Sequence, residues 1–250
     1  MERTTKIGFF HFGSGYGAPM KALRCALAKK AQEDLKGALI VLPEGFNIGK
    51  CYHDTKADID PEPDVIAALK AEALKYEIAF VGALILDSQR KKRNSAYLID
   101  ADDASPMCHK MVPDGMGDYD PCRDRCDEHN PKLYGGTLLG CLICADSDPP
   151  RPVPWREPSV ERDRLNAVIK KMPLGTTIPT ILCIPAHPHT LSGSGAPGAW
   201  PGYTVIFASS CDGADRGSSI GHLGETLADA EGPENVIKIV DLPVRGVPSG

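Results

Sequence analysis

Short, almost continuously apolar runs recur along the chain and predict buried strands. Such runs cover residues 6–12, 38–43, 78–86, 95–99, 178–185 and 203–209. Runs of this kind, without a polar residue at every second position, are typical of strands covered on both faces, as in parallel sheets. We therefore expect these strands to build the core.

The segments between the early runs have helical spacing instead. From Pro19 to about Leu35, apolar side chains recur every three or four residues after a proline suited to a first helical turn. Residues 64–76 and 160–171 also predict helices. Further short strands follow in residues 218–242, so the order of elements predicts an α/β architecture with mixed sheets. Because no linker interrupts this order, we expect residues 1–250 to form one domain.

Two segments fit neither pattern. Residues 111–136 are rich in Gly, Asp, Pro and Cys and lack a period, which predicts a long irregular loop. Residues 146–158 hold five prolines, which is incompatible with regular structure.

Charge and composition narrow the class of protein. The formal net charge is -5 and the basic cluster at residues 90–93 is short, so we expect no nucleic acid partner. No apolar run approaches the roughly 20 residues of a membrane helix, so no membrane partner is expected either. The N-terminus lacks the layout of a signal peptide. Nine scattered cysteines, an odd number, favour free thiols in a reducing compartment, and we expect a cytoplasmic protein.

A glycine-rich turn after the first predicted strand offers one candidate site. Residues 13–18 (GSGYGA) fit the pattern G-x-G-x-x-A, whose glycines let a pyrophosphate approach a helix N-terminus. The acidic partner should follow about 20 residues later, whereas Glu44 lies 31 positions after Gly13 (44 − 13). The late acidic residue argues against this site, and a nucleotide-binding oxidoreductase built on the Gly13–Ala18 turn is kept as an alternative.

Four cysteines offer a second candidate, a zinc site. Cys122, Cys126, Cys141 and Cys144 have the spacing C-x3-C-x14-C-x2-C. The second pair lies inside an apolar run, and alternate side chains of a strand point to opposite faces, so one ion would not reach both sulfurs. We expect no metal, and a zinc-binding interaction module is a distant alternative.

The same alternation separates Cys141 from Cys144. Cys141, deeper in the run, is expected to be a small core residue. Cys144 stands where the run ends, near the carboxyl end of the strand, where ligands collect in α/β sheets. A nucleophilic thiol needs a base and a nearby cation. Glu44 directly follows the apolar strand 38–43 and Lys110 follows residues 107–109, so three strand ends supply base, cation and nucleophile.

These residues lie in motifs that resemble the carbon–nitrogen hydrolase (nitrilase/amidase) superfamily. Three motifs occur in order: VLPE at 41–44, CHKMVP at 108–113 and GCLICAD at 140–146. They are similar to the family's Pro-Glu, lysine-then-proline and G-x-x-x-C-x-D motifs. NSAYLID at 94–100, GSSI at 217–220 and GETLA at 224–228 also resemble family segments, so the likeness covers roughly residues 6–242.

The resemblance implies a four-layer α-β-β-α sandwich (nitrilase-like) with mixed sheets and one Cys–Glu–Lys site. By this likeness Glu44 is the general base, and Cys144 attacks the substrate carbon to form a thioester-type intermediate. Lys110, with a backbone N–H near Ala145, steadies the negative charge on the tetrahedral oxygen. Burial of Glu44 beside the thiol is expected to tune the base toward neutral pH. The likeness also implies no cofactor and a homodimer or higher homo-oligomer.

Departures from the family pattern bear on the substrate. Ala145 and Asp146 follow the nucleophile, where nitrilases carry Trp-Glu, which is more similar to the amidase and carbamoylase branches. We therefore expect a small amide or N-carbamoyl substrate, with nitrile hydrolysis on the same site as the alternative. No clear counterpart of the family's second glutamate follows Lys110.

Four further residues are candidates for substrate contact. Arg151, Trp155 and Arg156 follow the nucleophile closely, and an arginine there can hold a carboxylate by a bidentate contact. His187 follows another predicted strand toward the same rim. A surface position for the arginines and a solvated loop for the histidine are the alternatives. A family member that only binds ligands is also an alternative, which Glu44, Lys110 and Cys144 together argue against.

Overall fold

Two six-stranded sheets form the centre of the computed structural model, which describes residues 3–13, 18–48, 64–88, 91–110, 129–147, 170–172, 180–186, 202–210 and 217–244. The first sheet has the order β12 (Asn235–Val244), β1 (Arg3–Phe12), β2 (Leu39–Glu44), β3 (Ala79–Ser88), β4 (Lys91–Ile99) and β5 (Ala104–His109). The second has the order β11 (Glu225–Ala230), β10 (Ser218–His222), β9 (Thr204–Ser209), β8 (Thr180–Ala186), β7 (Thr137–Cys141) and β6 (Lys132–Tyr134).

Both sheets are mixed, as predicted. In the first, β1, β2 and β3 are parallel and the outer strands pair antiparallel. In the second, β7, β8 and β9 are parallel and are flanked in the same way. The most continuous apolar runs form these central parallel strands, and every residue of β2 and β9 is buried. Burial on both faces explains why these runs lack a polar alternation.

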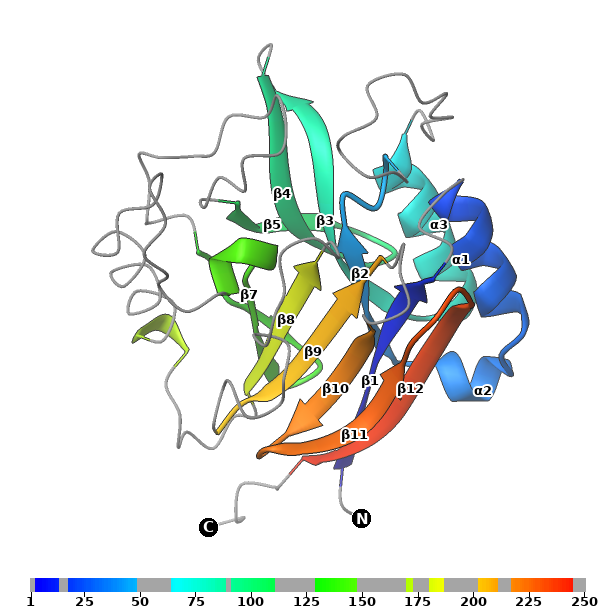
Figure 1. The fold of residues 1–250 in the computed structure, drawn as a ribbon, viewed down its shortest axis with the longest axis vertical. Coiled ribbons are helices and arrows are strands. Elements are labelled where there is room, and N and C mark those ends of the chain that lie inside the picture. Colours follow the sequence, from blue (N-terminus) through cyan, green and yellow to red (C-terminus); the bar gives the residue numbers. More distant parts are fainter. Residues whose placement is uncertain are drawn as a thin grey trace.

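Helices cover one face of the first sheet, and the second sheet covers its other face (Figure 1). The helices are α1 (Pro19–Ala28), α2 (Gln32–Leu35) and α3 (Val65–Tyr76). One buried cluster joins these helices to the first sheet, and a second fills the space between the sheets. The helix predicted at 160–171, which would supply the fourth layer, lies outside the described residues except for 170 and 171, which are helical.

Local signals explain where α3 begins and ends. The Asp64 side chain accepts a hydrogen bond of 2.9 Å from the backbone N–H of Ala67, which satisfies a donor at the helix start. Glu77 has a left-handed φ of 55° and ends the helix. The prediction of a helix over residues 64–76 is confirmed.

Two sequence predictions are wrong in detail. The helix expected from Pro19 to Leu35 is broken, because Ala31 is extended and α2 begins only at Gln32. Leu35 is fully buried, so the restart carries an apolar side chain back to the core. The irregular loop expected over 111–136 contains strand β6, which pairs with β7 at the edge of the second sheet.

A buried histidine joins the two sheets at the end where β1 and β9 finish. His11 Nδ1 lies 3.0 Å from Ser218 Oγ of the second sheet, and His11 Nε2 lies 2.9 Å from the carbonyl oxygen of Gly232. Because that carbonyl only accepts, Nε2 carries the proton and Nδ1 accepts from the serine hydroxyl. Burial lowers the pKa of His11, which keeps this joint neutral.

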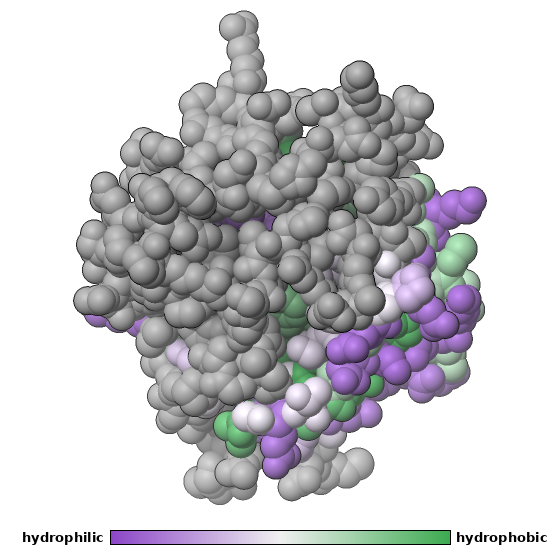
Figure 2. All heavy atoms as spheres, viewed as in Figure 1, coloured by the Kyte–Doolittle hydropathy of each residue, from purple (hydrophilic) through white to green (hydrophobic). Residues whose placement is uncertain are grey.

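The described part of the surface mixes hydrophilic and hydrophobic residues on the face seen in Figure 2. The exposed leucines Leu74 and Leu133 belong to different elements, α3 and β6. Among the described helices, none is long and apolar enough to cross a membrane.

Candidate active site

Glu44 is the last residue of β2 and lies in a fully buried position at the carboxyl end of the parallel strands. The strand is hydrogen-bonded on both sides, to β1 and β3, so it has no free edge. The register with β3 shifts between Val41 and Glu44, and Gly45 follows with a φ of 63°. This turn leads the chain away directly after the glutamate, whose side chain is 0% exposed.

Lys110 directly follows β5 and is held by the neighbouring strand β4. Its backbone N–H donates a hydrogen bond of 2.9 Å to the carbonyl oxygen of Asn94, which extends the β4–β5 pairing one residue past the strand. The Lys110 side chain is only 3% exposed. A buried ammonium needs a charged partner, because desolvation disfavours an isolated charge.

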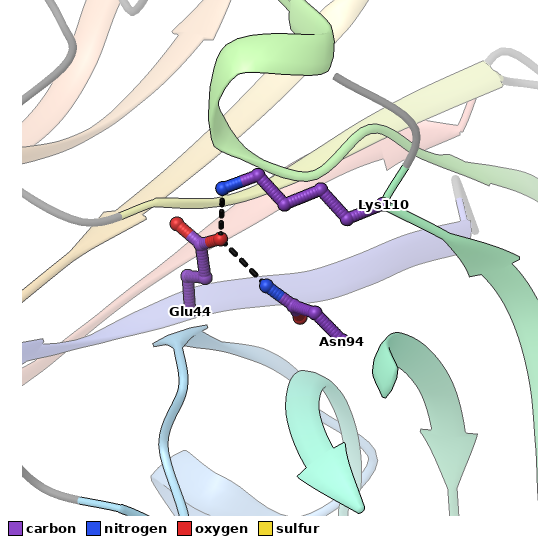
Figure 3. A network of polar contacts seen from close by, with 3 residues as sticks. All are labelled: Glu44, Asn94 and Lys110. Carbon is purple, nitrogen blue, oxygen red and sulfur yellow. Dashed lines mark hydrogen bonds and ion pairs between the residues drawn. The ribbon is translucent and has the colours of Figure 1, made fainter. Parts of the chain in front are cut away.

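That partner is Glu44, and a third residue shares it (Figure 3). Lys110 Nζ lies 2.5 Å from Glu44 Oε1, and the Asn94 amide Nδ2 donates to the same oxygen at 2.7 Å. Both donors favour the ionised carboxylate. The structure therefore brings together the predicted base and cation, which come from β2 and from the end of β5 at the edge of the sheet.

Cys144 lies in a tight turn beyond β7, and this corrects the argument from strand alternation. The strand ends at Cys141, and Cys144 begins the 3₁₀ helix η2 (Cys144–Ser147), so the two cysteines are not on one strand. Cys144 has a left-handed φ of 48°, which is uncommon outside glycine and is concentrated at functional sites. Hydrogen bonds from Leu142 N to Cys183 O and from Asp146 N to Ile143 O hold this turn.

The turn at Cys144 and the end of β5 lie at the same end of the sandwich. Cys108 of β5 and Cys141 of β7 lie in the same buried cluster and shift each other's pKa, so the ends of these two strands are close together. Lys110 follows Cys108 by two residues and Cys144 follows Cys141 by three. Cys144 is fully buried in the cluster between the sheets, which also contains Cys108 and Val41.

A cysteine–histidine pair at these strand ends was missed by the sequence analysis. Hydrogen bonds from Cys141 and His129 lower the pKa of the Cys108 thiol to about 7, against the effect of burial. Burial alone would lower the pKa of His129, but its hydrogen bond and Coulomb interaction with Cys108 raise it overall. In the sequence His129 lies near the cysteines of the zinc pattern, and that pattern gave no sign that His129 would pair with Cys108.

Cys141 keeps the structural role predicted for it. Burial and the contact with Cys108 raise the pKa of the Cys141 thiol well above its ordinary value, so it stays protonated. Cys122 and Cys126, the other half of the considered zinc site, lie outside the described residues. Within the part of the chain that the structure describes, no group of three or more His, Cys, Asp or Glu side chains is placed to hold a metal.

Most of the remaining candidates for substrate contact lie outside the described residues. Arg151, Trp155, Arg156 and His187 are not among the described residues, and the backbone of Ala145 lies in η2. In the turn considered for dinucleotide binding, Gly13 has a packing role. A Cβ atom there would lie 2.4 Å from the carbonyl oxygens of Gly232 and Glu234, so only glycine fits. Residues 14–17 lie outside the described part.

The solved structures that align with this chain include amidases, one of them described as a member of the nitrilase superfamily. A cysteine-to-serine mutant of the Nesterenkonia AN1 amidase aligns with a TM-score of 0.64 at 18% identity, over 96% of this chain and 92% of that chain. The crystal structure of an amidase from Nesterenkonia sp. gives 0.61 at 18% identity, over 96% and 90%. No family model and no curated protein matches the sequence. The chain therefore has the fold of the carbon–nitrogen hydrolase superfamily, as its motifs predicted.

One of these structures shows chemistry at a cysteine. A glutamate-to-glutamine mutant of the Nesterenkonia amidase shows covalent addition of the acetamide moiety of fluoroacetamide at its active site cysteine. It aligns with a TM-score of 0.61 at 18% identity, over 96% of this chain and 90% of that chain.

Proposed function

We propose that the protein is a cysteine-dependent amidohydrolase that cleaves a non-peptide C–N bond of a small amide or N-carbamoyl compound. The observation that carries this proposal is the buried Glu44–Lys110 pair, at the end of the sandwich where Cys144 occupies a strained turn. A buried ion pair is weak evidence for stability, because desolvation offsets much of its attraction. A base and a cation beside a cysteine turn have a direct use in nucleophilic catalysis.

In the proposed first step, Glu44 takes the thiol proton and the Cys144 sulfur attacks the carbonyl carbon. The carbonyl oxygen becomes negative, and Lys110 with a backbone N–H near Ala145 stabilises that charge. Glu44 then returns the proton to the nitrogen. Ammonia or an amine leaves and the acyl group remains on sulfur as a thioester.

In the second step, water replaces the departed amine. Glu44 takes a proton from the water, which attacks the thioester carbon, and the thiol of Cys144 leaves with that proton. The products are the carboxylic acid, or a carbamate from a carbamoyl substrate, and the regenerated enzyme. Nitrile hydrolysis is the second candidate, because the same thiol can add to a nitrile carbon.

Assembly and location belong to the same proposal. A single domain that forms a homodimer or higher homo-oligomer is what the likeness to the superfamily implies. Thiols that form no disulfide in the described part of the chain, at Cys25, Cys108, Cys141 and Cys183, support a reducing compartment such as the cytoplasm.

Ammonia release from a panel of small primary amides, N-carbamoyl compounds and nitriles tests the proposal. Wild-type protein is expected to release ammonia in the presence of a chelator, Cys144→Ala to release none, and Cys141→Ala to remain active. Equal loss in both variants, together with stoichiometric bound zinc, would contradict the hydrolase in favour of a metal site.

A further inference from the structure

We propose that Asn94 is a positioning residue for this reaction, which orients the carboxylate of Glu44 and fixes the chain at Lys110. This inference rests on the proposed function. It concerns a residue on β4 that touches both predicted catalytic groups, by different parts of its structure.

The two contacts of Asn94 connect three elements. Its side-chain Nδ2 donates to Glu44 Oε1 at 2.7 Å, and its backbone carbonyl accepts from Lys110 N at 2.9 Å. Asn94 is also paired with Ile85 of β3, so its own backbone is fixed within the sheet. One residue therefore sets the distance between the end of β2 and the end of β5.

The geometry at the carboxylate explains what this positioning does. Lys110 Nζ and Asn94 Nδ2 both donate to Oε1 (Figure 3), and two donors on one oxygen fix the rotation of the carboxylate plane. Because both contacts are made to Oε1, we assign Oε2 as the oxygen that takes the thiol proton. A general base must be held within hydrogen-bond reach of that proton.

A second asparagine, the half-buried Asn47, shows what a purely structural role looks like. Asn47 donates from Nδ2 to Ile85 O at 2.7 Å and accepts at Oδ1 from Ile85 N at 2.8 Å, so both ends of its amide hold the β3 backbone. Among the described residues, the Asn94 side chain makes a hydrogen bond through its donor alone, and that donor goes to a carboxylate. In the described part of the chain, Asn94 Oδ1 has no hydrogen-bond partner, although the residue is 3% exposed.

An unsatisfied buried acceptor lowers stability, because the hydrogen bond to water that it loses on burial is not replaced. Among the described residues, the Asn94 amide oxygen therefore adds no stabilising hydrogen bond. The hydrogen bond that its side chain donates to Glu44 Oε1 fits a role in which the amide orients the charged carboxylate.

Asn94→Leu tests this role, because leucine has nearly the same shape and no polar atoms. We expect kcat to fall by about 10- to 100-fold with KM within about twofold, since a small misplacement of a catalytic group has effects of this size. The acidic limb of the kcat/KM profile should move to higher pH, because the lost donor favoured the ionised carboxylate. Asn94→Asp should move it further, because a second carboxylate would face Oε1.

Asn47→Leu is the matched control and should lower the melting temperature while kcat and the pH profile stay near wild type. Ser95→Ala is a second control on the same strand, since it removes a hydrogen bond to His109 instead. Wild-type kcat and an unshifted acidic limb in folded Asn94→Leu would overturn the proposal. If Asn94→Leu does not fold, kcat and the acidic limb of the pH profile are measured in Asn94→Asp instead. Wild-type values of both in that variant would overturn the proposal.

Alkylation of Cys144 by iodoacetamide separates this proposal from the proposed function, because it needs no substrate. The pH midpoint of Cys144 alkylation should rise in Asn94→Leu, as the acidic limb does, because the thiol shares its proton with Glu44. A raised midpoint in a protein that hydrolyses no amide, carbamoyl compound or nitrile would support the positioning role and overturn the function. If the wild-type protein releases ammonia while the alkylation midpoint, kcat and pH profile are unchanged in Asn94→Leu, the proposed function is supported and the positioning role is overturned.

Discussion

Lys110 Nζ lies 2.5 Å from Oε1 of Glu44, and both side chains are almost completely buried, with exposures of 3% and 0%. The two residues are 66 positions apart in the sequence and come from the ends of different strands. Their contact is formed only when β3 and β4 stand between β2 and β5 in the sheet.

Removing one charge of this pair should lower the free energy of unfolding more than removing both charges. Lys110→Met leaves the buried carboxylate without its cation, and we expect the free energy of unfolding to fall by about 3–5 kcal/mol. The double variant Glu44→Gln/Lys110→Met removes both charges and should recover most of that loss, while neither variant releases ammonia. Chemical denaturation of the four proteins in the cycle measures this. Additive losses would show that the pair is not coupled.

The cysteine–histidine pair should titrate near neutral pH. Because the pKa of Cys108 is about 7 instead of 9.0, the ultraviolet absorbance of thiolate should show a transition near pH 7. The transition should disappear in Cys108→Ser and move to higher pH in His129→Leu, which removes a hydrogen bond that lowers this pKa. Burial raises the pKa of Cys183, so Cys183→Ser is the control that should leave the transition unchanged. A transition that persists in Cys108→Ser would refute the assignment.

The sign of the linked stability follows from these shifts. The lowered pKa of Cys108 contributes stability that is fully present above pH 9 and is lost as the pH falls through about 7. The raised pKa of His129 has the opposite sign, since its contribution is full below pH 6.5 and is lost as the pH rises through the folded value. Thiolate absorbance reports only the titration of the cysteine, whereas the pH dependence of stability combines both groups. Absorbance is therefore the more direct measurement.

A side chain at Gly140 should force Met172 to move, because Met172 packs directly against this glycine. A Cβ atom at Gly140 would lie 1.7 Å from Met172 Sδ, and Met172 is fully buried. We expect Gly140→Ala to reduce the free energy of unfolding by about 1–3 kcal/mol, as overpacking of a core does. Met172→Ala in the same chain should recover part of this loss, as measured by chemical denaturation.

Gly136→Ala is the matched control for that pair. Gly136 has a φ of 81° and open space where a Cβ would be, so alanine there is strained without a clash. Its loss of stability should be unaffected by Met172→Ala. If Met172→Ala fails to recover the Gly140→Ala loss, the close packing at β7 is not the cause.

The strands and the fold class could be predicted from the sequence better than the exact geometry of the candidate active site. Runs such as residues 38–43 and 203–209 are almost continuously apolar because their strands are covered on both faces, and the structure confirms the strands that these runs predicted. Glu44 and Lys110 were identifiable as charges at the ends of apolar segments, where burial demands a partner. The motifs pointed to the fold that the solved amidases share.

The parts that failed depend on contacts between distant segments. Cys144 was placed on a strand, because its apolar neighbours carry no sign that β7 ends at Cys141 and a 3₁₀ turn follows. Asn94 was noted only as part of a similar motif, since its role requires knowing which carboxylate faces β4. His129 acquires its raised pKa from Cys108, which lies far away in the sequence.

The thioester on Cys144 is the most direct test of the proposed chemistry. Wild-type protein is mixed with a small amide that it hydrolyses, and the reaction is quenched with acid during turnover. The protein is then digested, and the peptide that contains Cys144 is analysed by mass spectrometry. We predict an acyl group on Cys144 that is released by hydroxylamine as the hydroxamate and is absent from Cys144→Ala. Ammonia release without an acyl group on Cys144, or an acylated Cys141 or Cys108 in its place, would contradict the account.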